Sequence, residues 1–257
     1  MARAVALGVA VLLAALPGQA QEYSDAPTQS PRGGSVELRL GSYRPRVDAE
    51  EGLGGTPFKD IYGEGRWWLF ELELQRFFYQ GIGTAGVSLS GGYAEKYGYA
   101  LQKDRQTPSA ERAGFHVIPL HLRGVYRFDY PAFQWGFPLI PYVKPGLVFI
   151  PWWATKGGKL DEAPAKDAVE GGEGVEGSPA VAARKGTGVR FGWEVAVGLS
   201  FMLDVLEPRF ARDFDSDMGI NHSYIFAEYT YSKVNSFGQP GLNLSDSYWM
   251  FGLALDY

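Results

Sequence analysis

The chain ends with the stretch YWMFGLALDY, residues 248–257, in which large apolar side chains alternate with small or polar ones. The large apolar set is Trp249, Phe251, Leu253, Leu255 and Tyr257. Successive side chains of a β-strand point to opposite faces, so a period of two predicts a strand with one strongly apolar face.

Upstream segments carry the same alternation at residues 36–41, 68–75, 84–93, 118–128, 139–153, 190–201 and 224–232. We expect each segment to cross a bilayer as a tilted strand, for which about 9 to 11 residues suffice. The segment 139–153 is apolar on both faces and contains Pro141, Pro145 and Pro151, so we expect it to be irregular. The pattern predicts an all-β fold, namely an eight-stranded antiparallel up-and-down transmembrane β-barrel.

Composition excludes several classes of protein. The 257 residues are 46% hydrophobic and 15% aromatic with a net charge of -5, which excludes wholesale disorder and argues against a nucleic-acid partner. The absence of cysteine removes disulfides, thiolate metal sites and cysteine nucleophiles. Only three histidines are present, and His116 and His121 lie five apart on one predicted strand, facing opposite sides. We expect no metal and no cofactor.

The N-terminus has the three regions of a secretory signal peptide. Arg3 precedes an apolar run from Ala4 to Leu16, and Pro17-Gly18-Gln19-Ala20 offers small residues at a cleavage site. We therefore expect residues 1–20 to be removed, residues 21–34 to form a periplasmic segment and residues 35–257 to form the barrel. No later run is long and apolar enough for a membrane helix, so a membrane protein of this sequence must be a barrel.

The predicted connections alternate in length. Residues 45–65, 95–113, 154–188 and 235–246 are long, whereas 78–82 and 130–137 are short, as in a barrel with an extracellular and a periplasmic rim. The Gly-rich segment 154–188 should be a mobile extracellular loop. The periplasmic connection at 203–221 is unexpectedly long. Its Phe210, Phe214 and Met218 have helical spacing, which predicts a short periplasmic helix near 208–218.

The second face of the predicted strands carries five acids and five bases. They are Glu37, Arg39, Glu71, Glu73, Arg123, Arg127, Lys144, Arg190, Glu194 and Glu228. A basic side chain facing lipid at mid-bilayer costs about 2 to 4 kcal/mol, so these groups should face the interior. A soluble carrier would have the opposite polarity. Aromatic residues near strand ends, such as Trp68 and Trp249, favour the membrane reading. Eight strands enclose only enough space for side chains, so we expect a closed, charge-paired lumen.

The terminal stretch resembles the C-terminal signal of bacterial outer-membrane barrels, in which alternating hydrophobic residues precede a terminal aromatic. The chain is thus similar to eight-stranded barrels of the OmpA/OmpX class. Residues 40–48, LGSYRPRVD, and 219–229, GINHSYIFAEY, resemble strand motifs of a myxobacterial-type outer-membrane barrel family. The resemblance implies the outer membrane of a Gram-negative bacterium, contact with lipid or lipopolysaccharide, and recognition of Trp249, Phe251, Leu253, Leu255 and Tyr257 by the barrel-assembly machinery. An extracellular partner is not identified.

These features favour a structural or surface-interaction role through the extracellular loops, without enzymatic activity. One alternative is an enzyme acting on lipid A, with Asn221-His222-Ser223 and Glu228 as candidate groups. Adjacent strand residues point to opposite faces, which places His222 and Ser223 badly for a shared proton transfer. The other alternative is a narrow channel or small-ligand transporter through the lumen.

Overall fold

The barrel strands are all seen in this computed structural model, which describes residues 32–50, 55–101, 108–163, 184–207 and 217–257. The long strands are β1 (Gly34–Tyr43), β2 (Trp67–Gln80), β3 (Thr84–Leu101), β4 (Pro108–Val117), β5 (Leu120–Arg127), β6 (Leu139–Lys156), β10 (Thr187–Met202), β11 (His222–Lys233) and β12 (Asp246–Asp256). The predicted signal peptide and almost all of the predicted periplasmic segment lie outside the described residues.

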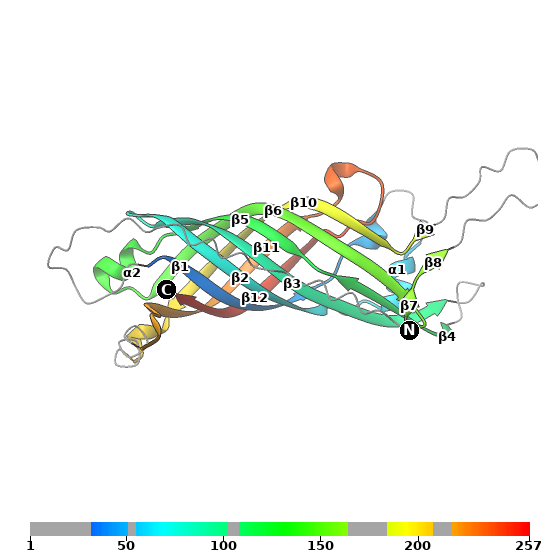
Figure 1. The fold of residues 1–257 in the computed structure, drawn as a ribbon, viewed down its shortest axis with the longest axis horizontal. Helices are drawn as coiled ribbons and strands as arrows, with labels where there is room; N and C mark the ends of the chain where they lie inside the picture. Colours follow the sequence, from blue (N-terminus) through cyan, green and yellow to red (C-terminus); the bar gives the residue numbers. More distant parts are fainter. Residues whose placement is uncertain (1–31, 51–54, 102–107, 164–183, 208–216) are drawn as a thin grey trace, which may run out of the picture.

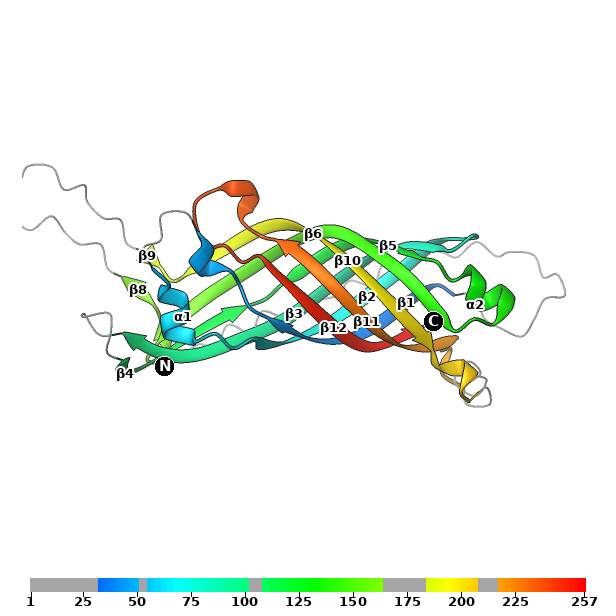
Figure 2. The same cartoon turned by 180° about the vertical axis from the view of Figure 1, so that it is seen from behind.

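The sheet closes on itself. β4 and β5 are one strand interrupted at Ile118 and Pro119, because both pair with β3 and with β6 in a constant register. β1 pairs with β2 on one side and with β12 on the other, and β6 pairs with β10, which completes an antiparallel ring. The predicted eight-stranded barrel is confirmed. Figure 1 shows the tilted strands, and Figure 2 shows blue β1 beside red β12 on the opposite side.

The proline-rich strand β6 is more regular than predicted. It runs through 18 residues and pairs with β10 continuously from Leu139 to Trp153. The irregularity is confined to the ladder with β5, which has no pair between Gly146 and Val143, where Pro145 supplies no N–H. Pro145 points outward, so its ring occupies the barrel exterior and does not displace the inward-facing Lys144.

The two rims of the barrel differ. One rim carries the start of β1, the end of β12, the short turn between β2 and β3, and the helix α2 (Tyr130–Trp135). The other carries the 3-10 turn η1 (Val47–Ala49), the helix α1 (Pro57–Tyr62), the short strands β7 (Lys159–Leu160), β8 (Glu162–Ala163) and β9 (Arg184–Lys185), and the turn η3 (Ser236–Gly238). Long connections at one rim and short ones at the other are typical of extracellular and periplasmic ends, respectively, and we name the two rims on this expectation.

The predicted loop at 95–113 is instead the projecting end of a hairpin. β3 and β4 remain paired from Ala94 to Leu101 and from Pro108 to Val117, beyond the length that a membrane strand needs. The extension persists because its inner face is covered. Phe58 and Tyr62 of α1 pack on Phe115 with ring centroids 5.2 and 6.0 Å apart.

Two other predicted segments fall largely outside the described residues. Of the connection 203–221, the structure describes the 3-10 turn η2 (Leu203–Val205) and the residues from 217 onward, so the predicted helix near 208–218 stays a prediction. Of the predicted loop 154–188, the described ends contribute the last residues of β6, the first of β10 and the pairs β6–β7 and β8–β9. No helix within the described ranges has the length and apolar character to cross a membrane.

Candidate functional site in the barrel interior

The two faces of the barrel wall have opposite polarity. Phe70 and Leu122 are 59% and 57% exposed on the outside, whereas their neighbours Glu71 and Arg123 are 5% and 1% exposed. Trp193 and Arg190 follow the same rule, with the tryptophan exposed and the arginine buried. The predicted orientation of the strands, with apolar side chains outward and ionised side chains inward, is therefore confirmed.

Most of the inward charges gather at mid-height in one group, which we term the central cluster. It comprises Glu37, Arg39, Glu71, Glu73, His121, Arg123, Lys144, Glu194 and Glu228. These residues come from β1, β2, β5, β6, β10 and β11, so that the cluster joins walls on all sides of the barrel. Glu37 is buried at 5% exposure, and the other members are at least as well buried.

Arg39 is the centre of the cluster. Its Nη1 atom lies 2.7 Å from Glu37 Oε2 and 3.0 Å from Glu73 Oε2. Its Nε atom donates to Glu71 Oε2 at 3.2 Å, and Nη2 donates to Glu228. A planar guanidinium presents five N–H donors in fixed directions, so one arginine can bind several carboxylates at once.

Lys144 and Arg123 connect the remaining acids. The Lys144 ammonium lies 2.8 Å from both Glu37 Oε2 and Glu73 Oε1. Arg123 reaches Glu73 Oε2 at 2.6 Å through Nη1 and Glu194 Oε1 at 2.7 Å through Nε. Glu73 thus contacts all three basic side chains of the cluster, which makes it the carboxylate on which the network converges.

His121 lies between two carboxylates. Its Nδ1 atom is 2.7 Å from Glu194 Oε1, and its Nε2 atom is 3.2 Å from Glu71 Oε1. The second contact is close enough for an ion pair but is not a hydrogen bond, since neither His121 Nε2 nor Glu71 Oε1 has a hydrogen-bond partner. Ionised carboxylates only accept hydrogen bonds, so Nδ1 donates to Glu194, while Nε2 faces the Glu71 carboxylate without a hydrogen bond.

The predicted balance of five acids and five bases is not what the cluster contains. It holds all five predicted acids but only three of the predicted bases, with His121 as an additional partner. Arg190 lies apart at the extracellular end, where it donates to the backbone carbonyls of Leu242 at 2.7 Å, Gln239 at 2.9 Å and Pro240 at 3.1 Å. Strand alternation predicts which face a residue occupies but not its height, and Arg190 is near the end of its strand.

Arg127, the fifth predicted base, belongs to a separate group at the periplasmic end. Its Nη1 atom donates to Asp256 Oδ1 at 2.9 Å. Beside this pair, Arg32 Nη1 lies 2.9 Å from Asp129 Oδ2. The acids Asp256 and Asp129 were missed by sequence reasoning, although Asp256 occupies the inward set of alternate positions in the terminal strand and could have been found by its parity.

An aromatic layer fills the interior above the central cluster. The inward-facing rings of Tyr43, Trp67, Phe115 and Tyr248 are buried, and Phe58 and Tyr62 of α1 pack against them from the extracellular side. Below the cluster, a second apolar group includes Ile140, Tyr142, Met202, Tyr224 and Phe226. The charged cluster is thus enclosed between two packed apolar layers.

The candidate lipid A chemistry is not supported by the geometry at the periplasmic rim. His222 Nδ1 lies 2.6 Å from Asp204 Oδ2, and the hydroxyl of Ser223 donates to Asp204 Oδ1 at 3.2 Å. A serine nucleophile needs the histidine between itself and the acid, but here the acid lies between the other two. The candidate Glu228 belongs to the central cluster.

The third predicted set, the terminal aromatic and aliphatic residues, lies on the barrel exterior. Trp249, Phe251, Leu253, Leu255 and Tyr257 are all exposed, and Phe251, Leu253 and Leu255 lie on the seam where β12 pairs with β1. Their recognition by an assembly machinery stays a prediction. In the part of the chain that the structure describes, no group of three or more His, Asp or Glu side chains is arranged to hold a metal ion.

A closed antiparallel barrel with an apolar exterior and buried, paired charges inside satisfies its backbone without water and presents hydrocarbon to lipid, which defines a transmembrane β-barrel of the outer-membrane class. One similar solved structure is Ail, the attachment invasion locus protein of Yersinia pestis, in complex with the heparin analogue sucrose octasulfate; it has a TM-score of 0.43 and 14% sequence identity, and the match covers 88% of this chain and 99% of that chain. Another is the N-terminal β-barrel domain of Pseudomonas aeruginosa OprF, with a TM-score of 0.33 and 12% identity over 88% of this chain and 100% of that chain. No family model matches the chain, and no curated protein is detectably similar in sequence.

Proposed function

We propose that the protein is an integral outer-membrane barrel of a Gram-negative bacterium that acts through its extracellular face and not through a pore. The observation that carries this proposal is the buried charge cluster that lies between two apolar layers. Arg39, Lys144 and Glu73 are buried in mutual ion pairs at mid-height, and packed apolar layers lie above and below them. A wall of this kind anchors surface segments rigidly and leaves no room for a solute.

The contacts of the central cluster argue against a channel in particular. Conduction needs sites that an ion can enter and leave, whereas these carboxylates are already paired with fixed cations from other strands. Removing one partner of such a buried pair costs about 3 to 5 kcal/mol, so the network resists opening. The role supported best is therefore structural or surface interaction, with the projecting β3–β4 hairpin and the turns η1 and η3 as the parts presented to the outside.

Two measurements test the proposal. Fractionation of cells combined with heat-modifiability on a gel should place the folded barrel in the outer membrane. Planar-bilayer recording of the purified chain should give no discrete conductance steps at either polarity. Steady steps that persist in repeated preparations would contradict a sealed interior and favour the narrow channel instead.

A suitable positive control weakens the aromatic layer and the central cluster together. A variant with Phe58→Ala, Arg39→Ala and Glu73→Ala empties part of the aromatic layer and of the cluster, and its conductance calibrates the smallest opening that the recording detects. The comparison requires that the variant is folded, which a shift of its gel mobility on boiling shows.

A further inference from the structure

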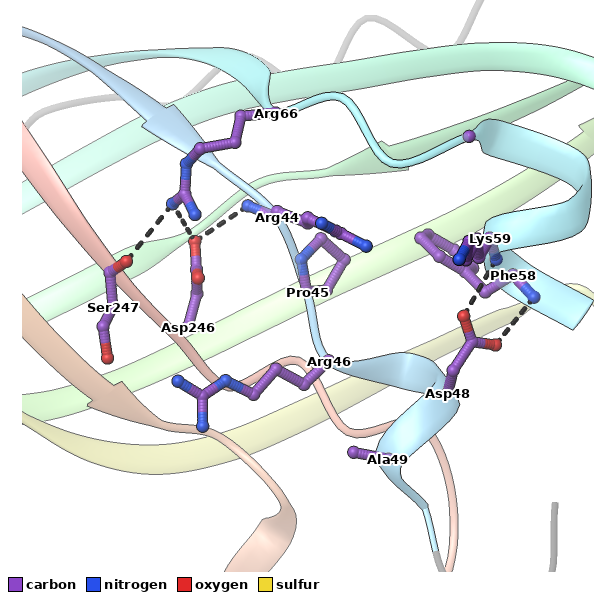
Figure 3. A pocket seen from close by; sticks show the side chains of 11 residues that line it. Arg44, Pro45, Arg46, Asp48, Ala49, Phe58, Lys59, Arg66, Asp246 and Ser247 are labelled. Atoms are coloured by element: carbon purple, nitrogen blue, oxygen red, sulfur yellow. Dashed lines mark hydrogen bonds and ion pairs between the residues drawn. The ribbon is translucent and has the colours of Figure 1, made fainter. Parts of the chain in front are cut away.

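A basic pocket opens at the extracellular rim, beside the ends of β1 and β12. It has a volume of about 490 Å³ and is lined by residues of the η1 segment and α1, together with Arg66, Asp246 and Ser247 (Figure 3). Its four cations are Arg44, Arg46, Lys59 and Arg66, and its two acids are Asp48 and Asp246. None of these groups belongs to the central cluster.

The two acids are already occupied by groups of the protein. Asp48 accepts the backbone N–H of Phe58 at 2.8 Å and of Lys59 at 2.9 Å, one on each carboxylate oxygen, and thereby holds α1 against η1. Asp246 accepts the backbone N–H of Arg44 at 2.8 Å and Nη2 of Arg66 at 2.6 Å. The guanidinium of Arg66 is further fixed on Ser42, whose hydroxyl and carbonyl it reaches at 2.9 and 2.8 Å.

The side chains of Arg44 and Arg46 form no ion pair or hydrogen bond with the residues that the structure describes. Arg44 is half-buried and is turned toward Lys59, while Arg46 extends along the side of the pocket that holds Asp246 and Ser247 (Figure 3). Among the described residues Lys59 forms an exposed ion pair with Glu64, which contributes little stability, and the same carboxylate also attracts Arg44 electrostatically. The pocket therefore presents more positive than negative charge, held on a backbone that Pro45, Asp48 and Asp246 make rigid.

The height of the pocket matches the lipid headgroups. Trp68 and Trp249 lie on the barrel exterior, at 69% and 54% exposure, where an aromatic belt marks the interface between hydrocarbon and water. Arg66 precedes Trp68 by two residues and Ser247 precedes Trp249 by two. At about 3.3 Å per residue, the pocket lies less than about 10 Å beyond the belt, at the level of headgroup phosphates.

We propose that this pocket binds a phosphate group on the headgroup of an outer-leaflet lipid. Two guanidinium groups and an ammonium line a space that the two acids do not fill, with Arg44 and Lys59 at one side and Arg46 at the other. Arginine and lysine form strong charge-assisted hydrogen bonds to phosphate oxygens. Arg44 and Lys59 hold the phosphate from one side, and Arg46 holds it from the other. The inference rests on the proposed function only in assigning this rim to the outside.

The test uses the full mature chain, folded in neutral detergent, and native mass spectrometry with bis-phosphorylated lipid A as the probe. Replacing Arg44→Gln together with Arg46→Gln should raise the dissociation constant at least tenfold. The matched control, Lys156→Gln with Lys159→Gln, removes the same charge from two exposed positions of the same rim outside the pocket and should change the constant by less than twofold. Heat-modifiability on a gel shows that both variants are folded.

Three results overturn the proposal. The first is an equal loss of affinity in the two double variants, which would assign binding to the overall charge of the rim. The second is binding of dephosphorylated lipid A as tight as that of the phosphorylated form. The third is displacement of lipid A by a soluble sulfated polysaccharide or by inorganic phosphate at equal concentration, which would assign the pocket to a soluble anion. If the wild-type barrel does not conduct, any of these three results contradicts the lipid-binding pocket and leaves the proposed function intact. Conductance steps in the wild type contradict the proposed function and leave the pocket intact.

Discussion

Arg127 on β5 and Asp256 on β12 stand on opposite walls of the barrel, and their side chains meet at 2.9 Å across the periplasmic end of the lumen. Three strands separate them in either direction around the ring. A second hydrogen bond, donated by the Tyr224 hydroxyl at 3.2 Å, holds the Asp256 carboxylate in place. The pair therefore fixes the last strand of the chain to the wall that faces it.

This pair should be strongly coupled in a double-mutant cycle. Arg127→Gln and Asp256→Asn each leave a buried charge without its partner, which typically costs about 3 to 5 kcal/mol. The double variant removes both charges of this pair and leaves Arg32 paired with Asp129 beside it, so it should lose less stability than the sum of the two single variants. Urea unfolding of the barrel in lipid vesicles, followed by tryptophan fluorescence, measures the coupling. Strict additivity of the three free energies would show that the side chains do not interact in the folded barrel.

The central cluster predicts an unequal response to the replacement of two buried arginines. Arg39→Met removes the cation that faces four carboxylates, so it should lower the free energy of unfolding by about 3 to 5 kcal/mol. Arg190→Met removes hydrogen bonds to three backbone carbonyls near the rim and should cost only about 1 to 3 kcal/mol. The same unfolding assay compares them. An equal loss would mean that the ion pairs of Arg39 add nothing beyond its burial.

Alternation made the strands and their two faces predictable, because each inward residue is separated from the next by one that faces lipid. Glu71 and Glu73 alternate with Phe70 and Leu72, and that parity alone placed the acids inside. Height along the barrel is a different quantity. It depends on strand stagger and tilt, which no single strand encodes, so Arg190 could not be distinguished from the members of the central cluster before its neighbours were known.

The helix α1 could not be predicted for another reason. A six-residue helix is too short to be stable from its own hydrogen bonds. It persists because Phe58 and Tyr62 pack into the barrel mouth and because Asp48 accepts two of its N-terminal N–H groups. The basic pocket depends on the same tertiary arrangement, since Arg44 and Lys59 are brought together only when α1 folds back over the end of β1.

The contact between Asp204 and His222 predicts a pH dependence at the periplasmic rim. Burial opposes ionisation of Asp204, but hydrogen bonds from the side chain of His222 and from the N–H and hydroxyl of Ser223 outweigh it and hold the pKa of this carboxyl below its ordinary value. A lowered folded-state pKa contributes stability above the unfolded value of about 3.9 and loses it as the pH falls through the folded value.

Asp204→Asn tests this directly, because the amide keeps an acceptor and removes the charge. The wild type should be more stable than the variant at pH 7, and the difference should shrink as the pH falls below about 4. Unfolding midpoints in urea between pH 3 and pH 7 measure the difference. A gap between wild type and variant that is constant over the whole range would show that the charge of Asp204 does not contribute.

The outward face of the barrel gives a test of membrane orientation. Leu122 is 57% exposed on the outside of β5, one residue from the buried Arg123. In a bilayer, Leu122→Arg should lower the free energy of unfolding by about 2 to 4 kcal/mol, because its charge would enter hydrocarbon. Trp135→Arg is the matched control, since Trp135 is 76% exposed in the helix α2 at the periplasmic rim and its replacement should cost under about 1 kcal/mol.

Measuring the free energy of unfolding of both variants in two media shows whether the outward face contacts lipid or is only apolar. In vesicles Leu122→Arg should be much the less stable of the two, whereas in detergent of low aggregation number, which lets water approach the charge, the gap should narrow. A Leu122→Arg barrel that folds in vesicles as stably as the Trp135→Arg barrel would place this face in water. The apolar exterior would then require an explanation other than the bilayer.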